Sequence, residues 1–129
     1  MTRPIRLMIV EDHDNLREQL AILMSNCEGI TVIGSTYNGE EALAMCATVH
    51  PEVILMDAMM PVMDGFTATE LIRQQFPRIR VVILSNGFLG EDIRALGAGA
   101  SVFLLKPVGS EEIVQAIYTA HADRQNTLQ

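Results

Sequence analysis

The chain has 129 residues, of which 49% are hydrophobic and 19% are charged, and its formal net charge at pH 7 is −7. This length suits one domain and this composition argues against intrinsic disorder, while no apolar run approaches the ~18 residues of a membrane span. The acidic balance argues against direct nucleic-acid binding, and the start of the chain lacks the apolar stretch of a secretory signal. We therefore expect a cytoplasmic protein that contacts neither nucleic acid nor a membrane.

Five short apolar runs, each followed by a helical pattern, succeed one another along the chain. In chain order, the predicted strands cover residues 5–10, 30–35, 53–56, 81–84 and 102–105. The helices are marked by apolar residues at helical spacing: Leu16, Leu20, Leu23 and Cys27; Leu43, Cys46, Ala47 and His50; Ala68, Leu71 and Ile72; the stretch Glu91 to Leu96; and Ile113, Ile117 and Ala120. Four of the strands are almost continuously apolar, which is typical of strands covered on both faces, whereas the second is more mixed and suits a sheet edge.

Polar and glycine residues signal where some of these helices start and stop. Asn38 with Glu41 three residues later is typical of a helix start, and so is Ser110 before two glutamates. Gly97 and Gly99 are typical of a helix end.

The alternation of strand and helix predicts an α/β fold. Because each strand is followed by a helix, the sheet should be parallel, with right-handed crossovers and helices on both faces. We expect a doubly wound, five-stranded sheet in the flavodoxin-like order 2-1-3-4-5, within a three-layer α/β/α domain. This domain should cover residues 1–122, followed by a polar tail at residues 123–129. In such sheets the functional site forms beyond the carboxyl ends of the strands.

Polar side chains stand at four of the predicted strand ends. They are Glu11 and Asp12 after the first strand, Asp57 after the third, Ser85 after the fourth and Lys106 after the fifth. Each of them alone has an ordinary explanation as a helix cap or turn residue. Together the three carboxylates should converge, and two such charges at ~4 Å repel by roughly 4 kcal/mol at an effective dielectric constant of ~20. Lys106, the only lysine in the chain, offers one compensating charge, and an all-oxygen cluster suits Mg²⁺ as another.

This combination of groups is the one that phosphoryl transfer requires. That chemistry depends on positioning and on neutralising charge on the phosphoryl oxygens. Asp57 is the candidate nucleophile, because an aspartate can carry a phosphoryl group covalently. The metal, Lys106 and Ser85 would each hold one oxygen of the group.

These residues and their spacing resemble the receiver domain of bacterial two-component response regulators. The resemblance covers about residues 6–121 and rests on Glu11-Asp12, on the segment 57–65, on Ser85, and on Phe103 to Pro107. The start Glu11-Asp12-His13 and the segment 99–106 are most similar to receivers of LuxR-type transcription regulators. Residues 123–129 would then begin a linker to an output domain that this chain does not contain.

The resemblance assigns roles around Asp57. It implies that Asp57 accepts a phosphoryl group from a phosphohistidine of a sensor histidine kinase. It also implies a Mg²⁺ site made by Asp12, Asp57 and the backbone carbonyl of Met59, with Glu11 acting through water. Such a domain promotes its own phosphorylation and dephosphorylation and is not an enzyme in the usual sense.

The resemblance also implies a switch and partners. Lys106 and Ser85 would contact the phosphoryl group, and Phe103 would move together with Ser85. The bond between Lys106 and Pro107 should be cis. Phosphorylation would drive homodimer formation and, through the output domain, regulate transcription. The chain departs from the usual pattern at Asn86, where a small residue is common, at Phe103, which lacks a tyrosine hydroxyl, and at Glu11, which is longer than the common aspartate.

Other functions compete with this interpretation. The run Asp12-His13-Asp14 resembles the nucleophile motif of haloacid-dehalogenase-type phosphatases, in which Asp12 would be the nucleophile, although Asn15 and the lack of a later Asp-Asp pair argue against it. A flavin carrier of the same topology would need a glycine- and hydroxyl-rich loop after the first strand, where this chain is acidic. A receiver that has lost phosphorylation and only docks partners is disfavoured by the intact acidic residues and lysine.

Overall fold

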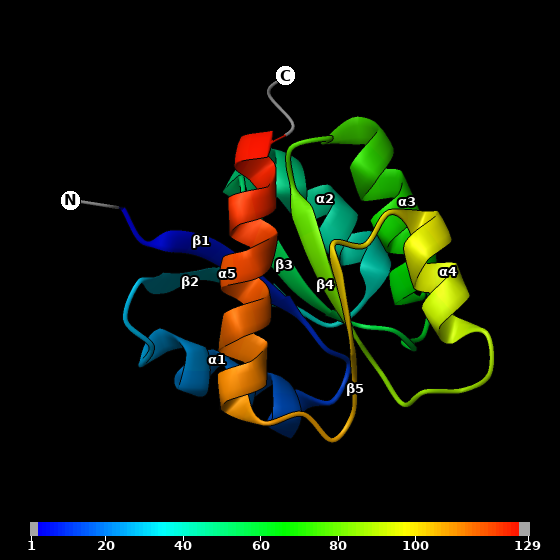
Figure 1. Ribbon diagram of the computed structural model, residues 1–129, viewed down its shortest axis with the longest axis horizontal. Helices are drawn as coiled ribbons and strands as arrows, with labels where there is room; N and C mark the ends of the chain where they lie inside the picture. The colour runs from blue at the N-terminus through cyan, green and yellow to red at the C-terminus, as the bar shows by residue number, and fades with distance from the viewer. Residues whose placement is uncertain (1–2, 127–129) are drawn as a thin grey trace.

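The computed structural model describes residues 3–126 of the chain. Its strands are β1 (Ile5–Val10), β2 (Ile30–Thr36), β3 (Val53–Asp57), β4 (Arg80–Ser85) and β5 (Val102–Leu105), and its helices are α1 (Asp14–Ser25), α2 (Gly39–Val49), α3 (Gly65–Gln75), α4 (Glu91–Ala98) and α5 (Ser110–Asn126). All neighbouring strands are parallel, in the order β2-β1-β3-β4-β5 (Figure 1). The predicted doubly wound fold is therefore confirmed.

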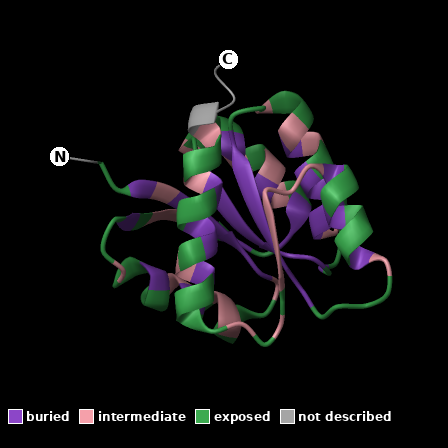
Figure 2. Ribbon diagram, in the orientation of Figure 1, coloured by how far each residue is buried: buried purple, intermediate pink, exposed green. Residues whose placement is uncertain are grey.

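The sheet separates two apolar layers. Because successive side chains of a strand point to opposite faces, each central strand contributes to both layers. Met8, Ile54 and Ile83 pack with the apolar residues of α2, α3 and α4, and Leu7, Leu55 and Val82 pack with those of α1 and α5. The central strands are buried along their length, as Figure 2 shows in purple. A rigid, buried sheet thus carries the residues at its carboxyl edge.

The two outer strands differ from the central ones. β2 forms one edge, as its mixed composition predicted. β5 forms the other edge: Phe103 packs on one face of the sheet and Val102 and Leu104 on the other, as predicted, but the strand is only partly buried. An apolar run of four residues is compatible with an edge strand, because the edge strand still contacts its neighbour and the helices on either side.

The predicted helical stripes need correction at four residues. Cys27 lies beyond α1, because that helix ends at Ser25. In α1, Leu23 is exposed and Met24 is buried, since the buried row continues from Leu20 by four residues rather than three. In α2, Ala47 is exposed. His50 lies beyond the helix, because α2 ends at Val49 and His50 adopts a left-handed conformation with φ of 55°.

The predicted helix ends are largely confirmed. The side chain of Asn38 accepts a hydrogen bond of 2.8 Å from the backbone N–H of Glu41 and so caps α2. Gly99 terminates α4 with φ of 92°, whereas Gly97 lies within the helix. α5 continues to Asn126, four residues into the predicted tail, and residues 127–129 of that tail lie outside the described part of the chain. Within residues 3–126, none of the helices has the length and apolarity needed to cross a bilayer.

Candidate functional site

The parallel register brings the predicted polar residues to one edge of the sheet. Asp57 pairs with Leu84 and Ser85 pairs with Leu105, so Asp57, Ser85 and Lys106 follow one another across three adjacent strands. The backbone N–H of Lys106 donates to the carbonyl of Ser85 at 2.7 Å. The Lys106-Pro107 bond is cis, as the resemblance implied.

Lys106 forms an ion pair with Asp57, and its ammonium group donates a hydrogen bond to Asp57 Oδ1. Asp57 is only 5% exposed. Burial raises the pKa of the Asp57 carboxyl, and the hydrogen bond from Lys106 acts in the opposite direction. The negative charges of Glu11 and Asp12 add to the rise, so that the pKa of Asp57 lies above its ordinary value. The carboxylate is therefore held in an electrostatically unfavourable position that an added cation would relieve.

Glu11 and Asp12 contribute buried carboxylate oxygens beside Asp57. Glu11 is 1% exposed, and its Oε2 accepts a hydrogen bond of 3.0 Å from the backbone N–H of His13. The other oxygen of Glu11, Oε1, and Oδ1 of Asp12 are buried, and neither has a hydrogen-bond partner in the described part of the chain. Buried polar atoms are ordinarily paired. Two unpaired anionic oxygens at one place therefore indicate a site shaped for a positively charged ligand.

His13 belongs to the same cluster, although a single histidine at the start of a helix is more often solvated than a ligand. Its Nδ1 lies 2.9 Å from Glu11 Oε2 and 3.5 Å from Asp12 Oδ1, while most of the side chain is exposed. The hydrogen bond to Glu11 and the negative charges of Asp12 and Glu11 raise the pKa of the His13 imidazole. A protonated His13 can thus partly neutralise the carboxylates.

The donor atoms of this cluster fit Mg²⁺. One ligand atom from each of Glu11, Asp12 and His13 lies within 4.8 Å of the others. Mg²⁺ prefers oxygen ligands and keeps several waters when bound by one or two carboxylates. The unpaired oxygens of Glu11 and Asp12 are such ligands, and we count the imidazole of His13 as a neighbour rather than a ligand.

Tight backbone packing fixes the segment that follows Asp57. The N–H of Gly65 donates to the carbonyl of Ala58 at 2.7 Å. A Cβ atom on Gly65 would overlap the carbonyl oxygen of Asp57, so only glycine fits where α3 begins. In the loop between Asp57 and Gly65, the N–H of Met63 donates to the carbonyl of Pro61 at 2.8 Å, and Val62 between these two residues has φ of 71°. The Asp57 carboxylate is therefore followed by a loop with little conformational freedom.

Ser85 has a partner that the sequence did not predict. Its hydroxyl donates a hydrogen bond to Oε1 of Glu91, and the same hydroxyl accepts one of 2.9 Å from the backbone N–H of Gly87. Phe103, on the neighbouring strand, is partly buried and packs against the layer of α2, α3 and α4. The ring of Phe103 lines a hollow of about 220 Å³ together with residues 87–90. An acidic residue at the start of a helix is ordinarily explained by the helix dipole. The sequence position of Glu91 therefore does not indicate a contact with Ser85.

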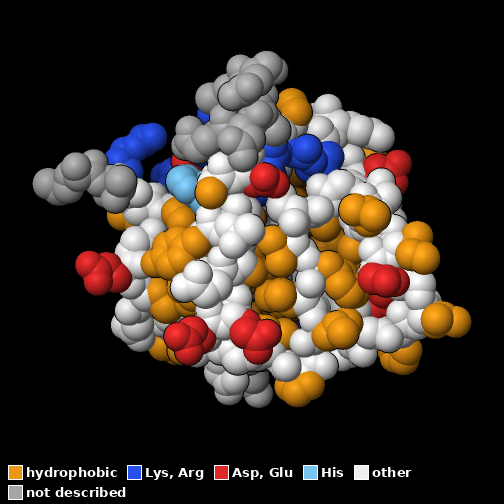
Figure 3. Space-filling model, in the orientation of Figure 1, with side chains coloured by type: hydrophobic (Ala, Val, Ile, Leu, Met, Phe, Trp, Pro, Cys, Tyr) orange, Lys and Arg blue, Asp and Glu red, His pale blue; other side chains and the backbone are white. Residues whose placement is uncertain are grey.

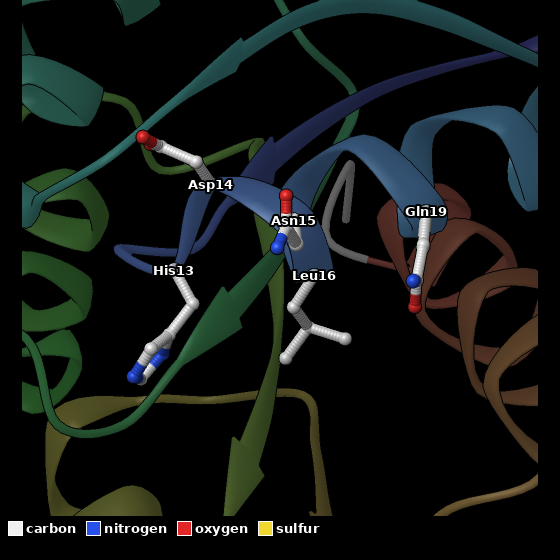
Figure 4. Close-up of a pocket in the computed structure, with 5 residues that line it drawn as sticks. All are labelled: His13, Asp14, Asn15, Leu16 and Gln19. Atoms are coloured by element: carbon white, nitrogen blue, oxygen red, sulfur yellow. The ribbon is translucent and has the colours of Figure 1, made fainter.

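The start of α1 argues against the phosphatase alternative. His13, Asp14, Leu16 and their neighbours line a surface hollow, and Figure 4 shows that the side chain of Asp14 points in a different direction from that of His13. Asp14 is 87% exposed and pairs with Arg17 at 2.7 Å. The motif would require Asp12 and Asp14 to act at one centre, whereas Asp14 forms a surface ion pair.

Comparison with known proteins defines the class. The response regulator receiver domain family matches residues 7–118, and the chain therefore belongs to this family. This membership overturns the haloacid-dehalogenase-type interpretation, in which Asp12 was the nucleophile.

Particular relatives are a transcriptional regulatory protein and a response regulator. The chain is 36% identical over 122 residues to the transcriptional regulatory protein LnrK of Bacillus subtilis (strain 168), a match that covers 92% of this chain and 54% of LnrK. It is 34% identical over 124 residues to the response regulator GacA of Pseudomonas aeruginosa, covering 94% of this chain and 57% of GacA. The chain thus spans about half the length of the curated relatives it matches.

Solved structures agree with this class. A two-component response regulator of the LuxR family from Aurantimonas sp. SI85-9A1 matches with a TM-score of 0.87 and 30% identity, over 94% of this chain and 87% of that one. The response regulator domain of CheB from Thermotoga maritima matches with a TM-score of 0.84 and 30% identity, over 93% and 98% of the two chains. The resemblance to LuxR-type receivers is confirmed.

Proposed function

We propose that this receiver domain accepts a phosphoryl group on Asp57 from a phosphohistidine of a sensor histidine kinase and relays the modification as a conformational change. The observation that carries the proposal is the buried Asp57 carboxylate, paired with Lys106 beside two buried carboxylate oxygens that lack partners. Such a centre has a nucleophile, a fixed cation and room for charge from a metal. These are the parts that phosphoryl transfer uses.

The residues that would hold Mg²⁺ are Glu11, Asp12, Asp57 and the backbone carbonyl of Met59. When bound, the ion supplies positive charge to the acceptor and phosphoryl oxygens, which lowers the cost of bringing anions together. Glu11 is fixed by the hydrogen bond from the His13 backbone and would act through water. Met59 itself is 48% exposed, so its side chain lies at the surface of the site.

Asp57 would carry out the covalent step. One of its carboxylate oxygens attacks the phosphorus atom, the new O–P bond forms as the N–P bond to the kinase histidine breaks, and the electron pair returns to the imidazole nitrogen. Lys106, already placed on the Asp57 carboxylate, stabilises charge that develops on the phosphoryl oxygens. The same groups would orient water during dephosphorylation.

The relay would pass through Ser85 and Phe103. A phosphoryl group adds strong acceptor oxygens, and Ser85 would move towards them. Phe103 would then turn into the vacated space, a change worth about 1 to 2 kcal/mol if the ring becomes more buried. Comparing the positions of Ser85 and Phe103 with and without beryllofluoride tests this relay.

The partners follow from the class of protein. We propose a sensor histidine kinase as phosphoryl donor in the cytoplasm, a homodimer of the phosphorylated domain, and an output domain outside this chain that regulates transcription. The name of LnrK as a transcriptional regulatory protein, and the coverage of 54% of its length, support the last point.

Phosphorylation with a small donor tests the proposal directly. The protein is incubated with acetyl phosphate and Mg²⁺, and its intact mass is measured by mass spectrometry. We expect wild type to gain one phosphoryl group that hydroxylamine removes, as it does from acyl phosphates, and Asp57→Asn to gain none. Asp14→Asn, which changes an exposed aspartate of α1, serves as the matched control and should be modified like wild type.

Two results would contradict the proposal. One is wild-type protein that stays unmodified although Mg²⁺ and acetyl phosphate are in excess. The other is Asp57→Asn protein that is modified at the wild-type rate, which would place the acceptor at another residue.

A further inference from the structure

Glu91, the first residue of α4, is a buried acidic residue without a cation beside it. It is 6% exposed, and none of the ion pairs found in residues 3–126 includes it. The nearest basic residue along the helix, Arg94, pairs with Asp64 at 3.5 Å. Burial of a carboxylate costs free energy unless hydrogen bonds or a counter-ion offset the lost hydration. Glu91 therefore depends on the hydrogen bonds it receives.

Ser85 supplies the side-chain hydrogen bond to Glu91. Both residues are buried, and the bond joins the last residue of β4 to the first residue of α4. A serine hydroxyl has a single proton to donate. Ser85 can donate that proton to Glu91 or to a phosphoryl oxygen on Asp57, but not to both at once.

We propose that Glu91 is a positioning residue that keeps the Ser85 hydroxyl bound to α4 until Asp57 is phosphorylated. The inference rests on the proposed function, because it assumes that Asp57 carries the phosphoryl group. The carboxylate of Glu91 and the phosphoryl oxygens compete for one proton. Phosphorylation is thus opposed by the loss of a charge-assisted hydrogen bond, which is stronger than a bond between neutral groups.

Release of Ser85 has a consequence for α4. Glu91 would be left buried without its donor and close to an added negative charge, so it would turn towards water. Its backbone N–H donates to the carbonyl of Phe88 at 3.1 Å, and Gly90 caps the helix with φ of 86° and no side-chain hydrogen bond. Movement of Glu91 would therefore shift the loop that carries the exposed Phe88 and Leu89. Figure 3 shows hydrophobic side chains on the side of the molecule where α4 lies.

The rate of phosphorylation by acetyl phosphate in Mg²⁺ tests this role in the intact chain. Glu91→Gln keeps the shape of the side chain but removes its charge, so Ser85 is released more easily and we expect a rate on the order of fivefold higher. Asp92→Asn is the matched control: it removes the same charge from the same turn of α4, but Asp92 is exposed and its carboxylate accepts from the N–H of Ile93. Its rate should equal that of wild type.

One double substitution separates a positioning role from a general effect of charge. In a Ser85→Ala background, Glu91→Gln should no longer change the rate, because the hydroxyl that links the two sites is absent. Melting curves establish that each variant is folded, and Glu91→Met, an uncharged residue of similar length, replaces Glu91→Gln if the latter is not.

The outcomes divide cleanly. If wild type is phosphorylated and Glu91→Gln reacts at the same rate, or accelerates equally in the Ser85→Ala background, the role of Glu91 is overturned while the proposed function stands. If wild type is not phosphorylated on Asp57, the proposed function and this inference fail together. The inference is supported if Glu91→Gln raises the rate of phosphorylation in the otherwise wild-type chain, while Asp92→Asn does not raise it and Glu91→Gln has no effect in the Ser85→Ala background.

Discussion

At the carboxyl edge of the sheet, Lys106 forms its ion pair with Asp57. Beside this pair, one buried carboxylate oxygen of Glu11 and one of Asp12 have no hydrogen-bond partner in the described part of the chain. The opposite edge, at the amino ends of the strands, is rich in arginine, and several of these arginines form hydrogen bonds. Its arginines donate to backbone carbonyls: Arg6 to His50 at 3.1 Å, Arg80 to Pro77 at 2.8 Å, and Arg124 to Arg78 at 3.0 Å. Arg124 also donates to Glu52 at 2.8 Å.

The contrast separates stability from function within one sheet. Paired charges at the amino edge hold loops to strands and contribute to folding, because each buried polar atom there regains a hydrogen bond. Unpaired carboxylate oxygens at the carboxyl edge cost stability and become useful only when a cation or a phosphoryl group arrives. Perturbations of the two edges should therefore have effects of opposite kind.

The largest effect should come from Mg²⁺ at the carboxyl edge. Binding to the folded state alone stabilises it, by about 2.7 kcal/mol at a Mg²⁺ concentration one hundred times the Kd. Urea unfolding of wild type with and without Mg²⁺ measures the change. Asp12→Asn removes one ligand and should abolish the response, and without Mg²⁺ this variant should be at least as stable as wild type. An equal response in wild type and Asp12→Asn would show that the ion binds elsewhere.

A smaller loss should follow from a substitution at the amino edge. Arg124→Ala removes the donors to Glu52 and to the carbonyl of Arg78, and hydrogen bonds to charged groups are worth about 2 kcal/mol. Urea unfolding should show a lower free energy of unfolding, with the rate of phosphorylation unchanged. Arg3→Ala, which truncates an exposed arginine near the start of the chain, is the control and should leave stability unchanged. A loss of phosphorylation in folded Arg124→Ala would break the separation of the two edges.

The smallest effect concerns the pH dependence of the amino edge. Burial opposes ionisation of Glu52, but the Arg6 backbone N–H and the charges of Arg124 and His121 outweigh it and hold the pKa of Glu52 below its ordinary value. A lowered folded-state pKa contributes stability above the unfolded pKa, and this contribution is lost as the pH falls through the folded pKa. Glu52→Gln should thus reduce the free energy of unfolding at pH ~7 by less than about 1 kcal/mol, allowing for solvent screening, and by progressively less as the pH falls through the folded-state pKa of Glu52.

Urea unfolding of wild type and Glu52→Gln across this pH range checks the expectation. A difference in stability that persists undiminished in acid would mean that Glu52 contributes through packing rather than through its charge.

The fold could be predicted from the sequence because its signal is local. Apolar runs separated by helical patterns predicted all the strands from β1 to β5. The residues that follow the third and fifth runs are Asp57 and Lys106, which form an ion pair in the structure. The exposure of β5 was not predictable in this way, since an apolar run does not reveal whether a strand lies at an edge. The order of the strands was predicted from the flavodoxin-like version of the doubly wound fold and not from the runs themselves.

The contact between Ser85 and Glu91 could not be predicted for a different reason. The two residues are joined by a loop whose path depends on Gly87 and Gly90, which have φ of 84° and 86°. Hydrophobic periodicity carries no information about such a path. The contacts of His13 could not be predicted either, because its proximity to the carboxylates of Glu11 and Asp12 is visible only in the three-dimensional arrangement.

Lys106 is the only lysine in the chain, and its ammonium group is held on Asp57, the proposed phosphoacceptor, while its side chain stays partly accessible. Amine-selective acylating reagents attack the neutral amine, and an ammonium group engaged with a carboxylate is protected from them. Apart from the amino terminus, every label that such a reagent attaches to this chain must report on the acceptor site. Peptide mapping of the acylated chain would then give the fraction of time that the Lys106–Asp57 pair is open, without any tag or substitution. Because the chain has no other lysine, Lys106 is an intrinsic chemical probe of the site around Asp57.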